Sequence, residues 1–260
     1  MTRPPDDSYT RSVRPLSYSQ ISAYQTCPLF YRFQYIDKLP TKPRFYFSFG
    51  HTLHRCAQFF YKRKEQVPPS LEDFLDFYER AWSSAGYFSK KREAADKQTG
   101  REILTRFWEI NSRDYRLPLA TEKWFTVDVG GVPFRGYIDR VDISPTGGLN
   151  ILDYKSGKRD ITTSDVEESL QLSMYQIGAS GTWLLPVEKL SLYHLRSNTN
   201  VEVGARDEAT IKRAEDTVTS VAQSIEDEEF EPRLNPSCPC EFSELCPLFN
   251  PGAEAPVPKS

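Results

Sequence analysis

The chain has 260 residues, of which 38% are hydrophobic and 27% charged, and its formal net charge at pH 7 is −3. This length suits one large domain or two small ones, and the near-neutral charge argues against non-specific coating of nucleic acid, although an enzyme with a local basic groove stays possible. No apolar run approaches the roughly 20 residues that a membrane-spanning helix needs, and the polar N-terminus lacks the apolar centre of a signal peptide, so we expect a cytoplasmic protein that does not bind a membrane.

Helical patterns dominate the first half of the chain. Residues 1–15 are polar and contain prolines, and we expect them to form a flexible leader. Apolar and aromatic residues at helical spacing follow from Ser17, and Pro28 is expected to break this segment into two helical pieces. The same spacing predicts three longer helices, at residues 47–63, 70–85 and 90–113.

The second half of the chain is predicted to contain a sheet. Residues 122–144 alternate like a β-hairpin with Gly130 and Gly131 at its turn, and residues 149–155 follow as a third strand. The remaining predicted elements are a helix at 166–180, a strand at 189–195, a helix at 207–226 and an irregular, Pro-rich tail at 227–260. Together these elements predict an α/β fold with a central mixed sheet flanked by helices, a helical N-terminal part and a cysteine-rich C-terminal tail.

The stretch from Leu149 to Asp160, LNILDYKSGKRD, begins as an apolar strand and then carries a carboxylate and an ammonium. Side chains alternate between the two faces of a strand, so Asp153 and Lys155 project from the same face. Alone, an Asp-x-Lys pattern is more often an exposed face or an ion pair than a catalytic pair. Asp139 makes the catalytic interpretation stronger, because it lies on the preceding predicted strand. If the two strands pair, their backbones are about 4.8 Å apart, and the two carboxylates can lie close together. Two such carboxylates can share Mg²⁺ or Mn²⁺, which suits phosphodiester hydrolysis, with Lys155 orienting a water or stabilising charge on the phosphate.

Two predicted helices supply further candidate residues. His54 lies four residues after Gly50, and imidazole suits Mn²⁺ as an additional ligand, although a lone histidine on a helix is more often packed or exposed. Gln171 and Tyr175 are four residues apart and therefore share one face of their helix. They indicate either the polar flank of an amphipathic helix or a pair that faces the active site and steadies Lys155.

These motifs, in the order G-x-x-x-H, G-x-x-D, D-x-K and Q-x-x-x-Y, resemble those of the RecB-like exonuclease family within the PD-(D/E)xK nuclease superfamily. The resemblance covers roughly residues 16–250, which we treat as one nuclease domain, with residues 251–260 as a flexible tail. It implies a restriction-endonuclease-like core. It also implies metal ligation by His54, Asp139, Asp153 and the carbonyl of Tyr154, catalysis by Lys155, and positions beside the site for Gln171, Tyr175 and Glu122.

Five cysteines are unevenly distributed, with Cys27 and Cys56 early and Cys238, Cys240 and Cys246 in the tail. A disulfide framework does not suit a chain of this size in the expected compartment, so a metal or cluster site is the better interpretation. In the iron–sulfur branch of the resembled family, one early and three late cysteines bind a [4Fe–4S] cluster that joins the two ends of the domain. The resemblance therefore implies a cluster on Cys27, Cys238, Cys240 and Cys246, and it leaves Cys56 as a small core residue.

The cysteine motif of the tail departs from the family pattern at one place. The family motif resembles C-x-x-C-x5-C, whereas this chain has C-x-C-x5-C, which displaces Cys238 by one position. A structural zinc ion held by the same four cysteines is the competing interpretation.

Aromatic and basic residues are relevant because single-stranded nucleic acid binds to aromatic platforms and cations. The aromatic clusters at residues 29–35 and 45–49 are candidates for base stacking, although core packing is the commoner fate of such residues. Basic residues concentrate in the predicted helix at 90–113 and around Lys158 and Arg159.

The resemblance implies a metal-dependent DNA exonuclease that acts on single-stranded or end-containing DNA in recombination or repair. Three alternatives stay open: a CRISPR adaptation nuclease, a zinc-stapled endonuclease, and a non-catalytic DNA-binding subunit of a helicase–nuclease complex. The complete set of His54, Asp139, Asp153 and Lys155 disfavours the last of these. The sequence contains no G-x-x-x-x-G-K-[ST] phosphate loop, so any helicase, recombination or CRISPR partner would be a separate protein.

Overall fold

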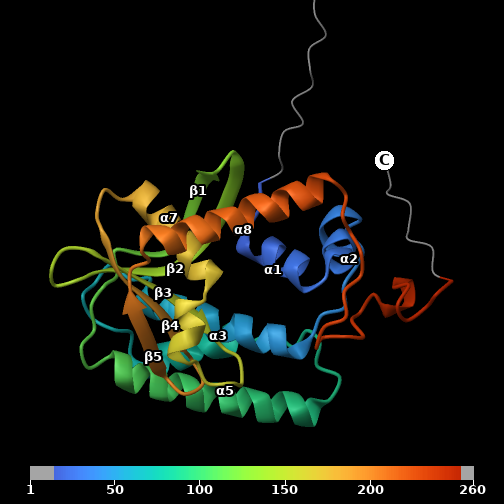
Figure 1. Ribbon diagram of the computed structural model, residues 1–260. Coiled ribbons are helices and arrows are strands. Elements are labelled where there is room, and N and C mark those ends of the chain that lie inside the picture. Colours follow the sequence, from blue (N-terminus) through green and yellow to red (C-terminus); the bar gives the residue numbers. More distant parts are fainter. Residues whose placement is uncertain (1–14, 253–260) are drawn as a thin grey trace, which may run out of the picture.

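The computed structural model describes residues 15–252, so the predicted leader and tail, residues 1–15 and 251–260, lie almost wholly outside it. A five-stranded sheet runs through the molecule, with helices packed on both of its faces (Figure 1). Its strands, in their spatial order, are β1 (Ala120–Val129), β2 (Val132–Ile143), β3 (Leu149–Lys155), β4 (Val187–His194) and β5 (Thr199–Gly204).

The sheet is mixed. The pairs β1–β2, β2–β3 and β4–β5 are antiparallel, whereas β3 and β4 are parallel. A parallel connection must cross over one face of the sheet, and the chain between β3 and β4 accordingly forms two helices, α6 (Thr163–Glu167) and α7 (Leu170–Thr182). The predicted α/β fold with a central mixed sheet flanked by helices is confirmed.

Helices in the N-terminal part and after the sheet complete the described fold. They are α1 (Tyr18–Thr26), α2 (Pro28–Tyr31) with a π-helical turn (Arg32–Ile36), α3 (Phe45–Tyr61), α4 (Leu71–Ala81), α5 (Lys90–Asn111), α8 (Glu208–Glu226) and a 3₁₀ turn (Ser243–Leu245). The predicted break at Pro28 is confirmed, because α1 ends before it and Pro28 is the first residue of α2. No helix among residues 15–252 is long and apolar enough to cross a membrane.

Two hydrophobic cores fill the space between the sheet and the helices on its two sides. On one side, α1, α7 and α8 pack against strand residues such as Ile138 and Ile151. On the other side, α3, α4 and α5 pack against Leu152 and Tyr154. Successive residues of β3 therefore face opposite cores, and Asp153 shares the α7 side with Ile151.

The tight turn between β1 and β2 agrees with the sequence. Gly130 and Gly131 both have positive φ angles, +60° and +87°, which a two-residue hairpin turn of this kind needs and which glycine adopts without a Cβ clash.

Two predicted features are wrong. The single helix predicted at 166–180 is interrupted between α6 and α7, because Ser169 caps α7 by accepting a hydrogen bond from the backbone N–H of Leu172. The strand β5 was not predicted, because it is short and its residues are largely polar and mostly exposed at the edge of the sheet. A polar edge strand of this kind carries little hydrophobic pattern, and its existence depends on the neighbouring strand β4.

Candidate active site and cysteine pocket

Asp153 and Lys155 meet at the C-terminal end of β3. Their side chains project from the same face of the strand, and Lys155 Nζ lies 2.7 Å from Asp153 Oδ2. Asp153 is only 2% exposed, and a carboxylate buried so deeply requires charged or hydrogen-bonding partners. Burial lowers the pKa of Lys155, but the charge of Asp153 and the hydrogen bond to it raise the pKa by more, so Lys155 stays an ammonium at neutral pH.

Helix α7 supplies the other polar partners of this pair. The side-chain amide of Gln171, in the first turn of α7, accepts from Lys155 Nζ at 2.7 Å and donates to Asp153 Oδ1 at 2.8 Å. One turn later, the hydroxyl of Tyr175 donates to the same Asp153 oxygen at 3.3 Å and accepts from Gln171 Nε2 at 2.8 Å. Gln171 and Tyr175 thus face Asp153 and Lys155 rather than solvent.

Asp139 reaches the same place from β2. Its Oδ2 accepts a hydrogen bond from the backbone N–H of Tyr154 at 2.9 Å, and His54 Nδ1 on α3 lies 3.7 Å from the same oxygen. Burial raises the pKa of Asp139, and the negative charge of Asp153 raises it further. Burial lowers the pKa of His54, so its imidazole is neutral at pH 7 and offers a lone pair.

One glycine explains how α3 can approach the end of β3. A Cβ at Gly50 would lie 2.5 Å from Oγ of Ser156, the first residue beyond β3. The absence of that atom lets the backbone of α3 pack directly against Ser156. His54 follows one helical turn later and is thereby brought beside Asp139.

Two further residues border the site. Glu122 on β1 has a φ angle of +49°, which interrupts its regular pairing opposite Asp139. Burial raises the pKa of Glu122, and the charge of Asp153 adds to this rise. Tyr18, at the start of α1, is close enough to Lys155 to contribute to its raised pKa. No sequence motif indicated Tyr18, because its proximity results from tertiary packing alone.

The donors around Asp139 and Asp153 fit a hard divalent cation. Two carboxylates, one buried and one partly buried, and a neutral imidazole are ligands that Mg²⁺ or Mn²⁺ accepts. Within residues 15–252, no three His, Cys, Asp or Glu side chains are drawn together as a finished metal site. The fit therefore rests on chemistry: a cation between Asp139 and Asp153 would relieve the repulsion and desolvation that raise the pKa of Asp139.

Asp139→Asn is expected to stabilise the metal-free protein. The raised pKa of Asp139 means that its charged form is unfavourable in the folded state, so the stability that the protonated group contributes is lost as the pH rises through this pKa. An Asn oxygen still accepts the hydrogen bond from the Tyr154 N–H but carries no charge. The melting temperature at neutral pH, measured by calorimetry without divalent cations, should rise by about 2–4 °C if roughly 1 kcal/mol is recovered.

Asp142→Asn is the matched control for this experiment. Asp142 lies on the same strand, but its carboxylate forms an ion pair with Arg140 at 2.9 Å. Burial raises the pKa of Asp142 as well, but Arg140 opposes this rise and no neighbouring carboxylate adds to it, so the melting temperature of Asp142→Asn should rise by less than that of Asp139→Asn. An equal or larger rise for Asp142→Asn would contradict the proposed repulsion between Asp139 and Asp153.

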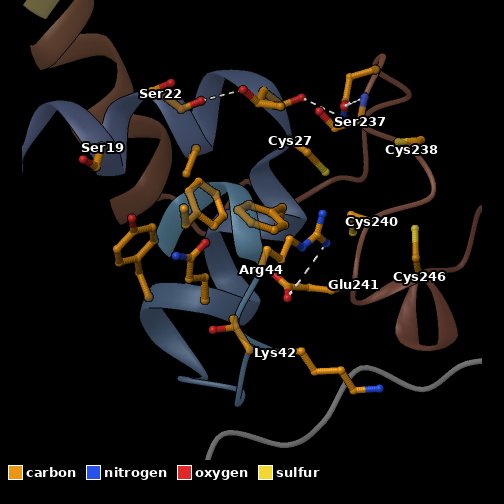
Figure 2. A pocket seen from close by; sticks show the side chains of 18 of the residues that line it. Ser19, Ser22, Cys27, Lys42, Arg44, Ser237, Cys238, Cys240, Glu241 and Cys246 are labelled. Atoms are coloured by element: carbon orange, nitrogen blue, oxygen red, sulfur yellow. Dashed lines mark hydrogen bonds and ion pairs between the residues drawn. The ribbon is translucent and has the colours of Figure 1, made fainter. Parts of the chain in front are cut away.

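Cys27, Cys238, Cys240 and Cys246 line one pocket of about 650 Å³ between the α1–α2 junction and the C-terminal tail (Figure 2). All four are free thiols. The backbone N–H of Arg233 donates to Cys27 Sγ at 3.4 Å across a sequence separation of 206 residues, and Cys238 Sγ lies 3.9 Å from the Arg233 carbonyl oxygen, to which it donates. The pocket thus joins the two ends of the described chain.

The donor set of this pocket fits a four-thiolate cofactor in type and number. Burial raises the pKa of the Cys240 thiol, and the charges of Cys27, Cys238 and Cys246 also raise it. The four sulfur atoms are therefore close enough to influence one another electrostatically. Four thiolates are the usual ligands of a [4Fe–4S] cluster and also of a structural zinc ion.

Cys56 lies apart from this pocket. It is fully buried in the core under α3, and burial raises the pKa of its thiol to about 12. The interpretation of Cys56 as a core residue is confirmed, and a thiol of this kind is unreactive.

Comparisons with known proteins found one matching family model and several similar proteins. The model of the PD-(D/E)XK nuclease superfamily matches residues 15–247. Gene 69 protein of Mycobacterium phage L5 is 23% identical over 293 residues, which covers 92% of this chain and 99% of that protein. Gene 69 protein of Mycobacterium phage D29 is 24% identical over 274 residues, with coverages of 90% and 96%. A crystal structure of a protein from Eubacterium rectale, named as a candidate exonuclease, has a TM-score of 0.52 at 13% identity and covers 100% of this chain and 97% of that one, so it shares the fold.

Proposed function

Since this chain belongs to the PD-(D/E)XK nuclease superfamily, we propose that it is a metal-dependent DNA exonuclease that hydrolyses phosphodiester bonds in single-stranded or end-containing DNA. The observation that carries this proposal is the hydrogen-bonded set of Asp139, Asp153, Lys155 and Gln171 at the end of β3. A subunit without catalytic function would not need a buried carboxylate pair beside an oriented ammonium, which is costly to bury.

Asp139, Asp153, His54 and the backbone carbonyl of Tyr154 are the groups that we assign to a bound Mg²⁺ or Mn²⁺. When bound, such an ion supplies a Lewis acid for the phosphate and lowers the pKa of a ligated water. The contribution of the chain is to bring together two carboxylates from adjacent strands, of which Asp153 is buried, and a partly exposed imidazole from α3.

Lys155 is assigned to charge stabilisation. Its pKa is raised, since the charge of Asp153 outweighs the effect of burial, so it carries a proton at neutral pH. It therefore acts by holding a positive charge beside the phosphate or by orienting a water, and it does not serve as a proton acceptor in this state. Gln171 fixes the direction of the ammonium through the bond of 2.7 Å.

Gln171→Ala is expected to lower kcat by about 10- to 100-fold, the usual cost of losing a group that orients metal-binding or catalytic residues. The substitution removes one partner from both Lys155 and Asp153 but leaves their ion pair in place. The initial rate of release of labelled nucleotides measures the effect. Gln223→Ala is the control: Gln223 lies on the exposed face of α8, where its side chain donates to the Asp227 carboxylate, and this variant should cleave like the parent. Equal rates for Gln171→Ala and the parent would remove Gln171 from the site.

A cofactor on Cys27, Cys238, Cys240 and Cys246 is the second part of the proposal. We assign a [4Fe–4S] cluster to these residues, with a structural zinc ion as the alternative. Their shared pocket and free thiols support either cofactor. In both cases the cofactor would tie the α1–α2 junction to the tail and act structurally.

DNA is the proposed substrate, and recombination or repair is the proposed setting. A separate helicase, recombination or CRISPR protein is the proposed type of partner, because the sequence has no phosphate-loop motif for a motor of its own. A CRISPR adaptation nuclease would share the same residues, so it remains the second candidate.

Cleavage of single-stranded DNA labelled separately at its 5′ and 3′ ends tests the proposal. The protein would be purified without oxygen and assayed with Mg²⁺ or Mn²⁺, beside the same sequence as a closed circle. Progressive loss of label from one end, with the circle intact, is the expected result. Cleavage of the circle would indicate an endonuclease, and no cleavage of either would favour a non-catalytic binding subunit.

A further inference from the structure

Two large aromatic side chains lie exposed and paired across the β1–β2 hairpin. Trp124 and Tyr137 are directly opposite each other in the antiparallel pair, with ring centroids 4.8 Å apart. Trp124 is 45% exposed and Tyr137 52% exposed. Paired rings of this kind stabilise the hairpin, and their exposed faces also offer an apolar surface that a ligand can cover.

The aromatic pair lies on the face of the hairpin that is turned away from α7. Along β2, Phe134 and Ile138 face the core beneath α7, so the alternating residues Arg135 and Tyr137 face the other way. Helix α3, which brings His54 to Asp139, packs on this same side of the sheet. Tyr137 is two residues from Asp139, a distance of about 7 Å along a strand.

Arg135, two residues before Tyr137 on β2, places a cation beside the aromatic pair. Arg135 is exposed, and among the described residues no ion pair is formed by its guanidinium. Arginine can bind a phosphate through a fork of N–H donors and can also stack on a base. Along β2, a cation, an aromatic ring and a carboxylate thus follow one another at two-residue intervals, at Arg135, Tyr137 and Asp139. A strand of nucleic acid whose phosphate lay at Asp139 would have its neighbouring nucleotide over the aromatic pair.

Resting on the nuclease function proposed above, we propose that Trp124, Tyr137 and Arg135 form a platform that binds unpaired bases next to the Asp139–Asp153 centre. Every base has a π-face, so stacking tolerates any sequence, while the faces of bases inside a duplex are already stacked. The platform therefore selects a single strand. It also holds the nucleotide beside the one that is cleaved.

Binding of a labelled single-stranded oligonucleotide, followed by fluorescence anisotropy without added divalent cation, tests the platform independently of cleavage. Trp124→Ala and Tyr137→Ala should each raise Kd by about 5- to 150-fold, the usual loss for one stacked base. Phe88→Ala is the control, because Phe88 is 95% exposed on the loop before α5, and it should bind like the parent. Melting temperatures equal to that of the parent would exclude misfolding as the cause.

Trp124→Phe provides a second, conservative variant. A phenyl ring still stacks, so its Kd should stay within a few-fold of the parent value, whereas the quenching of tryptophan fluorescence on binding should be lost. Arg135→Gln should weaken binding and reduce its salt dependence, because one phosphate contact is removed.

The outcomes separate the platform from the nuclease function. Binding that depends on Trp124 and Tyr137, without cleavage by the parent, would support the platform and overturn the nuclease. Cleavage by the parent with unchanged Kd in both variants would overturn the platform alone. Equal weakening by Phe88→Ala, or a shift from dimer to monomer in Tyr137→Ala with unchanged Kd, would also overturn it, the latter in favour of an interface with a second copy of the chain.

Discussion

Asp153→Asn is expected to lower the rate of DNA cleavage by about a thousandfold or more while the protein still folds. The carboxylate of Asp153 is the most buried group of the site and contacts Lys155, Gln171 and Tyr175. Its removal takes away the charge that is proposed to hold the divalent ion, and electrostatic contributions of a bound metal are worth several kcal/mol. Each 1.36 kcal/mol of lost transition-state stabilisation is a factor of ten in rate.

The measurement is the single-turnover rate on end-labelled single-stranded DNA at saturating Mn²⁺. Asp128→Asn is the matched control, because Asp128 accepts a hydrogen bond from the Gly131 N–H at the hairpin turn, which an Asn side chain also accepts. The control should cleave like the parent. Circular dichroism of Asp153→Asn should match that of the parent, since Asn keeps the shape and one carbonyl acceptor. Residual cleavage near the parent rate would show that the reaction takes place elsewhere.

Much of the fold was predictable because its signals are local. Alternation of apolar residues predicts β1 and β2, and short apolar stretches predict β3 and β4. The two glycines of the hairpin turn supply the positive φ angles that the turn requires. The unpredicted strand β5 and the interruption before α7 depend on other parts of the chain. Strand β5 forms by pairing with the edge of β4, and the interruption before α7 results from the N-cap of Ser169. Periodicity alone does not report either contact.

The candidate site divides in the same way. The proximity of Asp139 to Asp153 and the common face of Asp153 and Lys155 follow from strand pairing and alternation, which the sequence displays. The position of Tyr18 beside Lys155 follows from packing of α1, which no motif signals. Glu122 was expected beside the site from the resemblance, but its left-handed backbone conformation, which a glutamate rarely prefers, was not predictable from residue type.

The aromatic candidates show the same limit. Aromatics at residues 29–35 and 45–49 drew attention because they are dense in sequence, yet Phe33 is buried against the tail. Phe47 is exposed. Trp124 and Tyr137 are 13 residues apart and become a pair only through the register of the hairpin. Exposure and pairing, which decide whether a ring can stack on a base, are therefore properties of the folded sheet.

Cys246→Ser is expected to remove the cofactor and to lower the stability of the purified protein by a large amount. Cys246 is buried with Leu29, Phe33 and Phe242, so the tail already packs on α2 and its sulfur faces the pocket of the other three cysteines. A cross-link that closes a loop of about 100 residues is worth about 4.7 kcal/mol, and doubling the loop adds about 0.6. A cofactor that joins Cys27 to the tail closes a loop of about twice that length, so the free energy of unfolding of the variant should fall by about 5 kcal/mol.

Iron, acid-labile sulfide and zinc contents per chain, measured on protein purified without oxygen, decide which cofactor is present. Chemical denaturation of the same samples measures the stability. Cys56→Ala is the matched control, since Cys56 is a buried cysteine in a different core; it should keep the full metal content and lose only the cost of a small cavity. Iron and sulfide in the parent that disappear in Cys246→Ser would support the cluster, whereas zinc alone would support the four-thiolate zinc site. If Cys246→Ser kept the metal content and the unfolding midpoint of the parent, the tail would be held by the packing of Phe242 and its neighbours alone, and the assignment of any cofactor to this pocket would fail.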